Sequence, residues 1–120
     1  MISPIGIRVR DREGVPLVSL EGEIDIANAA ELQDRLLPLL SSNSPPGLIV
    51  NLSDVTFIDS RGVHVIFELA KRMSIRHQQL RLVVPRAALI RRILLLIHKD
   101  DLIPLDETVE DAAAQMQVPR

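Results

Sequence analysis

The feature that most constrains the fold is a short apolar run, residues 48–52, in which Asn51 is the one polar residue. A run that is apolar at nearly every position, rather than at every second one, is typical of a strand covered on both faces, as in a parallel sheet. Serine, asparagine, proline and glycine crowd the segment 41–47 just before it, and these residues favour a loop. The sequence therefore predicts a central strand that follows a surface loop.

Strands and helices alternate on both sides of this run. Apolar and polar residues alternate at the start of the chain, which predicts an antiparallel hairpin closed by the polar turn 11–14. Asn28 with Glu31 has the spacing of a capping box. Beyond residue 52 we expect a turn at Ser53-Asp54 and a short extended piece that ends at Asp59. The remaining expected elements are strands at 5–9, 15–20, 80–84 and 102–105, and helices at 29–40, 60–73, 87–97 and 108–116.

This order of elements predicts the fold class. Strands that alternate with helices imply right-handed crossovers and a mainly parallel sheet. The first strand is expected to add to one edge of that sheet in the antiparallel sense. A chain of 120 residues has the size of one domain. We therefore expect a single α/β domain over 1–120, with an ordered core at about 4–116, a mixed but mostly parallel sheet and about four packed helices.

Composition argues against several classes of function. The chain has no cysteine, a net charge of −2 and only two aromatic residues, Phe57 and Phe67, which disfavours thiolate metal sites and nucleic-acid platforms. Its three histidines lack metal-ligand spacing, and no glycine-rich phosphate loop is present. We expect no cofactor and no metal. The N-terminus lacks a signal-peptide pattern, and the apolar run 93–97 is too short to cross a bilayer, so a cytoplasmic protein is expected.

Asp59 and Ser60 stand where a strand gives way to an amphipathic helix. The N-terminus of a helix favours negative charge, so Ser60 is a candidate for phosphorylation. Helix amides and Arg61 would attract the phosphate, while Asp59 would repel it. Local chemistry alone favours the simpler interpretation that Asp59 or Ser60 caps the helix.

A hydrolase is a weaker alternative. Ser60 and His64 are one helical turn apart and share a helix face. A serine hydrolase also needs a carboxylate that orients the base, and an oxyanion hole. The Gly-x-Ser-x-Gly elbow is absent because Ile58 stands at its first glycine. We therefore expect His64 to be a solvent-facing helix residue and the protein not to be an enzyme.

Two motifs together resemble the STAS family, whose soluble members are anti-sigma factor antagonists. The first is Leu-Glu-Gly-Glu-Ile-Asp at 20–25, followed by Ala30. The second is Asn-Leu-Ser-Asp-Val-Thr-Phe-Ile-Asp-Ser-Arg-Gly-Val at 51–63, with an Asp-Ser-x-Gly core. The resemblance covers nearly the whole chain and implies a small STAS-like α/β domain without catalytic residues or cofactors of its own.

The resemblance implies a partner switch in the stress response of a bacterium. The unphosphorylated protein would bind an anti-sigma factor that is also a serine kinase, and would thereby free the sigma factor for transcription. That kinase, which would hold ATP and magnesium, would phosphorylate Ser60 and weaken the complex, and a serine phosphatase would reset it. The implied partner-binding residues are Asp25, Asp59, Ser60, Arg61, Gly62 and His64.

Two of these positions carry further expectations. Gly62 would leave room for a partner to approach the serine. His64 replaces the small residue that is usual at its position, which would alter the fit of the partner. A second departure from the family pattern is Lys-Asp-Asp-Leu at 99–102, where a Gly-Leu turn is common.

Other functions of the same fold stay open at this point. They are an accessory subunit of a lipid ABC transporter and a scaffold protomer of a stress-signalling complex. No nucleic acid and no direct membrane insertion are expected, and a homodimer is left open. The run 93–97 makes the third helix apolar almost all round, so either the last helix covers its far side or a leucine is exposed for a partner.

Overall fold

A mixed sheet runs through the computed structural model, which describes residues 5–12, 14–40, 47–97 and 103–116. Its strands are β1 (Ile5–Arg12), β2 (Val15–Ile24), β3 (Gly47–Ile58), β4 (Gln79–Val83) and β5 (Leu105–Asp106), in that spatial order. The helices are α1 (Ala29–Leu40), α2 (Ser60–Ile75), α3 (Leu89–Ile97) and α4 (Val109–Gln115). β1 pairs with β2 in the antiparallel sense, and the other neighbours are parallel. The expected fold class is confirmed.

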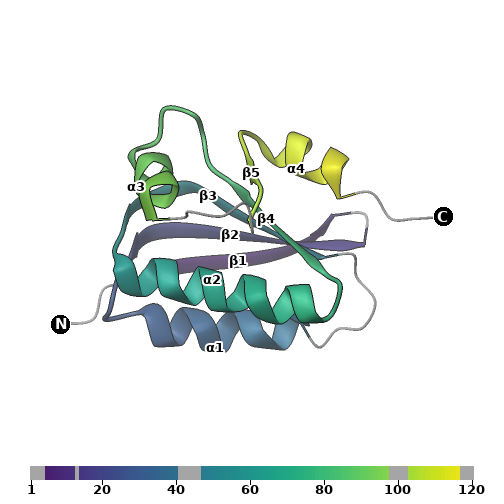
Figure 1. Ribbon diagram of the computed structural model, residues 1–120, viewed down its shortest axis with the longest axis horizontal. Helices are drawn as coiled ribbons and strands as arrows, with labels where there is room; N and C mark the ends of the chain where they lie inside the picture. The colour runs from purple at the N-terminus through teal and green to yellow at the C-terminus, as the bar shows by residue number, and fades with distance from the viewer. Residues whose placement is uncertain (1–4, 13, 41–46, 98–102, 117–120) are drawn as a thin grey trace.

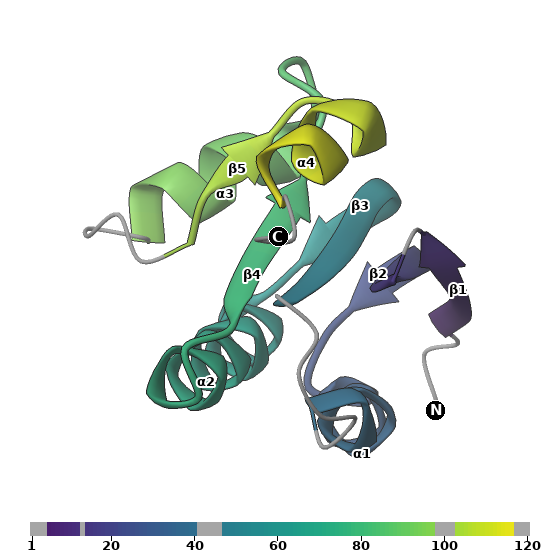
Figure 2. The same cartoon turned by 90° about the vertical axis from the view of Figure 1, so that its right-hand side faces the viewer.

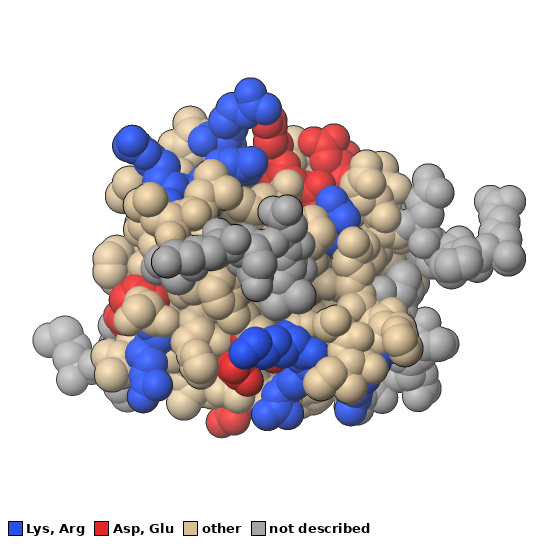
Figure 3. Space-filling view, viewed as in Figure 1, with Lys and Arg blue, Asp and Glu red and all other residues tan. Residues whose placement is uncertain are grey.

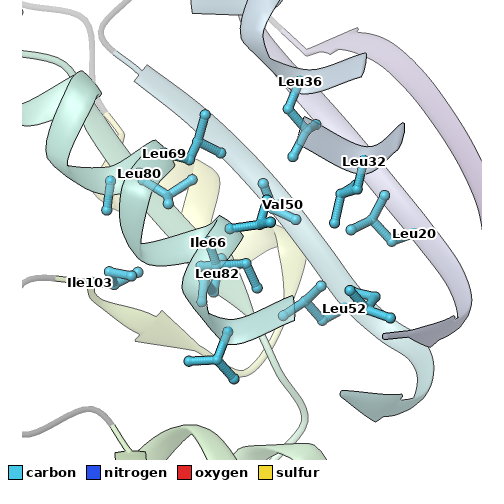
Figure 4. Packing of buried hydrophobic residues seen from close by; sticks show 14 of the residues in the cluster. Leu20, Leu32, Leu36, Val50, Leu52, Ile66, Leu69, Leu80, Leu82 and Ile103 are labelled. Atoms are coloured by element: carbon cyan, nitrogen blue, oxygen red, sulfur yellow. The ribbon is translucent and has the colours of Figure 1, made fainter. Parts of the chain in front are cut away.

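The helices cover the sheet on both sides. Figure 1 shows α1 and α2 running along the sheet, and Figure 2 shows them together on one face with α3 and α4 at the opposite side of the molecule. The main core lies under α1 and α2, where leucines of both helices meet the central strands (Figure 4). A smaller cluster packs under α4: Val15, Ile49, Val83, Ala112 and Met116.

The apolar run 48–52 is covered on both faces, as its pattern predicts. Val50 and Leu52 belong to the main core, whereas Ile49 belongs to the cluster under α4. Neighbouring residues of a strand point to opposite faces, so both layers need this strand to be apolar throughout. The run is the central strand around which the molecule packs.

β3 continues past the point where a turn was expected. It extends through Ser53 and Asp54 to Ile58, and its pairing with β2 shifts register twice. The shifts are bulges, in which extra residues of β3 are absorbed without ending the ladder. At the first bulge the Asn51 side chain accepts hydrogen bonds from the Ser53 backbone amide (3.0 Å) and hydroxyl (2.6 Å). Ser53 and Asp54, where a turn was expected, therefore lie in a bulged part of β3.

The helices follow the predicted pattern with small shifts at their ends. α1 buries the four residues expected of it, Ala29, Leu32, Leu36 and Leu40, and contains Pro38. α2 continues to Ile75, and α3 begins at Leu89. The Thr108 hydroxyl caps α4 by accepting from the Asp111 amide at 3.0 Å. The Lys-Asp-Asp-Leu departure at 99–102 and the loop residues 41–46 lie outside the described residues.

Candidate partner-binding site

The site lies at the carboxyl ends of β2 and β3. These strands are parallel neighbours, and their last residues, Ile24 and Ile58, are paired. The Asp59 amide continues the contact by donating to the Ile24 carbonyl at 3.1 Å. The segments that follow the two strands therefore emerge side by side, one leading into α1 and the other into α2 (Figure 1). In parallel sheets this edge is where binding sites form.

Asp59, rather than Ser60, caps α2. Its Oδ1 atom accepts hydrogen bonds from the amides of Arg61 and Gly62, both at 3.0 Å. Ser60 is the first residue of the helix, and its side chain is exposed. Within the described residues the Ser60 hydroxyl has no hydrogen-bond partner. Because Asp59 satisfies the helix amides, the serine is left open to solvent at the positive end of the helix.

The second oxygen of Asp59 reaches the other segment. Asp59 Oδ2 accepts from the backbone amide of Ile26 at 3.1 Å, across 33 positions of sequence. One carboxylate therefore joins the start of α2 to the turn between β2 and α1. This turn, residues 25–28, is called the 25–28 turn below.

The 25–28 turn is also braced from within. Asp25 Oδ1 accepts from the Ala27 amide at 2.9 Å. Asn28 is buried, and its side chain accepts from the Asp25 amide (3.0 Å) and donates to the Glu23 carbonyl (2.7 Å). A buried amide whose hydrogen bonds are made in this way fixes the shape of the turn. Asn28, for which a capping role was expected, is observed as a brace for Asp25.

Ile26 is the residue of this site that the sequence did not single out. Its side chain is 69% exposed, although its backbone amide is held by Asp59. A single exposed aliphatic side chain is common on protein surfaces, but this one belongs to a braced turn that is hydrogen-bonded to the cap of α2, so it lies where a partner that approaches the start of α2 can contact it. The available signal was an isoleucine between Asp25 and Asn28, where turn chemistry favours polar residues.

Gly62 has a different role from the one expected. It is buried, and a Cβ atom at this position would lie 2.6 Å from Ile24 Cγ2 and 2.8 Å from Ile58 Cγ1. The missing side chain therefore lets the first turn of α2 pack on the ends of β2 and β3. The interpretation that it leaves room for a partner is corrected, because the space is occupied by the two isoleucines.

Arg61 and His64 are exposed on the first turns of α2. Ser60 and His64 are one turn apart, but no hydrogen bond joins them in the described part of the chain. The nearby carboxylate of Asp59 holds three backbone amides instead of a histidine. A serine hydrolase needs the serine, the histidine and the carboxylate linked in series, and this arrangement is not assembled here.

The surface around the fold carries charges of both signs. On the face shown in Figure 3, Lys and Arg side chains are interspersed with Asp and Glu, without a single basic stripe. Among the described residues no group of three or more His, Asp or Glu side chains is placed to hold a metal ion. No helix within the described ranges is long and apolar enough to span a membrane.

The fold and the site described above agree with a known family of protein domains. The STAS domain model matches residues 6–112, and the chain therefore belongs to the STAS family.

Two relatives are similar over most of the chain. The anti-sigma-F factor antagonist RsfB of Mycobacterium tuberculosis is 31% identical over 109 residues, which cover 90% of this chain and 86% of RsfB. The crystal structure of an anti-sigma factor antagonist from Mycobacterium paratuberculosis superposes with a TM-score of 0.82 at 30% identity, covering 97% of this chain and 98% of the other.

The same fold has been solved in a phosphorylated protein. The Bacillus cell fate determinant SpoIIAA in its phosphorylated form aligns with a TM-score of 0.67 at 15% identity, over 93% of this chain and all of that one. At this identity the likeness concerns the fold alone.

Proposed function

We infer that this protein is an anti-sigma factor antagonist that binds an anti-sigma factor through the surface around Ser60 and is switched off by phosphorylation of that serine. The observation that carries the inference is the division of roles at the start of α2: Asp59 caps the helix, and Ser60 keeps an exposed hydroxyl without a partner among the described residues. The two antagonists to which the chain is 30% and 31% identical support the assignment. The protein acts by binding and catalyses no reaction.

The proposed modification is a phosphoryl transfer from ATP held by the anti-sigma factor. The Ser60 Oγ atom forms a bond to the γ-phosphorus, ADP leaves, and the hydroxyl proton passes to a base of the kinase. A serine phosphatase hydrolyses the phosphoester and restores the hydroxyl. ATP and magnesium belong to the kinase, and we place the exchange in the cytoplasm, where sigma factors and ATP meet.

Charge explains why the modification would end binding. A phosphoserine brings about −1.5 to −2 charges. Asp25 and Asp59 already place two carboxylates at this edge of the sheet, one on each of the adjoining segments. A partner surface that fits a neutral serine between two acids would meet a strongly negative patch after phosphorylation, and like-charge contact weakens association.

The test uses the cognate kinase with ATP and mass spectrometry of the product. We expect one phosphate on the wild type and on Ser74→Ala, a control that removes an exposed serine at the far end of α2. Ser60→Ala should bind the kinase as the wild type does but take up no phosphate, and Ser60→Asp should bind it about tenfold or more weakly. A kinase that binds the wild type yet leaves Ser60 unmodified would contradict the proposal.

A further inference from the structure

We propose that Asp59 is a positioning residue that couples the state of Ser60 to the 25–28 turn, and through it to the exposed side chain of Ile26. The coupling rests on the proposed function, in which Ser60 is the residue that is modified. One planar carboxylate carries it: Oδ1 holds the amides of Arg61 and Gly62, and Oδ2 holds the amide of Ile26.

The two ends of this link have different supports. The 25–28 turn keeps its internal shape through Asn28, which is buried and bonded to Asp25 and Glu23. The turn is tied to the start of α2 by the bond from the Asp59 amide to the Ile24 carbonyl and, within the turn itself, by the contact from Ile26 to Asp59. Loss of that contact would therefore shift or loosen the turn as a unit without unfolding it.

A phosphoryl group on Ser60 competes with Asp59 for the same donors. The first-turn amides of a helix are the groups that bind anions at its N-terminus. In the unmodified protein the amides of Arg61 and Gly62 are both taken by Asp59 Oδ1. Two anions on adjacent residues also repel each other. The phosphoryl oxygens displace the carboxylate, and because its two oxygens move together, Oδ2 leaves the Ile26 amide in the same step.

The consequence is a change of shape as well as of charge. Ile26, with 69% of its surface exposed, is tied to the start of α2 through the hydrogen bond from its amide to Asp59. The partner surface that fits the unmodified protein is apolar opposite Ile26. Phosphorylation then withdraws this apolar contact in addition to placing negative charge at Ser60.

The substitution Asp59→Asn isolates the link. The remaining amide oxygen can still accept from the two helix amides, but the NH2 group that replaces Oδ2 cannot accept from the Ile26 amide. Amide hydrogen exchange followed by NMR should be about tenfold faster at Ile26, the effect of losing one charge-assisted hydrogen bond, and should change by clearly less at Arg61 and Gly62, which keep an acceptor that is now neutral. Asp34→Asn, which removes the same charge from the exposed face of α1, should change none of these rates. Unchanged exchange at Ile26 in Asp59→Asn would overturn the proposal.

Phosphoserine placed at position 60 by semisynthesis tests the coupling without any kinase. We expect Ile26 exchange to rise to the level seen in Asp59→Asn. A modified protein in which Ile26 stays as protected as in the wild type would overturn the coupling even if the kinase phosphorylates Ser60. Failure of the kinase to modify Ser60 would instead refute the proposed function, and the semisynthetic protein would still decide the coupling.

The affinity for the anti-sigma factor distinguishes a positioning role of Asp59 from a purely structural one. Ile26→Ala should weaken the complex with the anti-sigma factor about tenfold in the wild type and by much less in the Asp59→Asn background. Equal losses in the two backgrounds would mean that Asp59 does not position Ile26.

Discussion

Two adjacent residues have separate tasks at the start of α2. Both carboxylate oxygens of Asp59 accept hydrogen bonds from backbone amides, whereas the Ser60 side chain is exposed to solvent. If Ser60 were the cap, its oxygen would be engaged by a helix amide. The chemistry that makes the serine available for modification is therefore supplied by its neighbour.

Gly62 sets the distance between α2 and the sheet at the same place. In Gly62→Ala the added Cβ would meet the side chains of Ile24 and Ile58 at 2.6 and 2.8 Å. Both isoleucines are buried in the main core, so they cannot turn toward solvent without disturbing its packing. We expect the free energy of unfolding to fall by about 1–3 kcal/mol in spite of the better helix propensity of alanine.

Urea unfolding monitored by circular dichroism measures this loss. His64→Ala, an exposed position on the same helix, serves as the control and should change the free energy of unfolding by less than about 0.5 kcal/mol. A Gly62→Ala protein as stable as the wild type would show that the first turn of α2 can move away from the strands.

At the scale of elements, the short strand β5 depends on a buried ion pair. The side chains of Arg81 on β4 and Asp106 on β5 form two hydrogen bonds, Nε to Oδ2 at 2.7 Å and Nη2 to Oδ1 at 3.0 Å. They are only 11% and 9% exposed. β5 has only two residues, so this bidentate pair contributes much of what holds the strand against β4 before the chain enters α4.

Removing one partner of this pair should be costly. Asp106→Ala leaves the Arg81 guanidinium buried without its carboxylate, and we expect a loss of about 3–5 kcal/mol in the free energy of unfolding. The double variant Arg81→Met with Asp106→Leu should recover much of that loss, because no buried charge remains. Glu31→Ala breaks the exposed pair with Arg35, which is 4.0 Å long, and should cost about 0.5 kcal/mol or less. Equal effects of Asp106→Ala and Glu31→Ala would contradict the argument.

Helix α3 is apolar almost all round, and part of its apolar surface is exposed rather than covered by the last helix. Leu95 and Leu96 are 55% and 77% exposed, whereas Leu94 is buried in the main core. Leu94→Ala should therefore lower the free energy of unfolding by about 2–5 kcal/mol. Leu96→Gln should change it by less than about 0.5 kcal/mol. Thermal unfolding of the two variants checks the contrast, and a large loss in Leu96→Gln would mean that this leucine is covered in solution.

For the molecule as a whole, much of the architecture can be predicted from the sequence, because the patterns that indicate strands and helices are local. The apolar run 48–52 predicts the central strand, and the alternation of strands and helices predicts the parallel order. The continuation of β3 beyond Asp54 differs from the turn expected there, because a Ser-Asp pair favours a turn locally, whereas pairing with β2 holds it in a bulged strand.

For the candidate site too, some features follow from the sequence and others from the folded structure. The chemical groups of the site follow from the sequence: an acid, a serine and a glycine at the start of a helix, and a second acidic segment before α1. Their roles follow from the folded arrangement, because each role depends on contacts between segments that are distant in the sequence. The pairing of β2 with β3 brings Ile26 to Asp59 across 33 positions, and the packing of α2 fills the space beside Gly62 with Ile24 and Ile58. Local spacing encodes which groups are present, and the parallel sheet determines which of them touch.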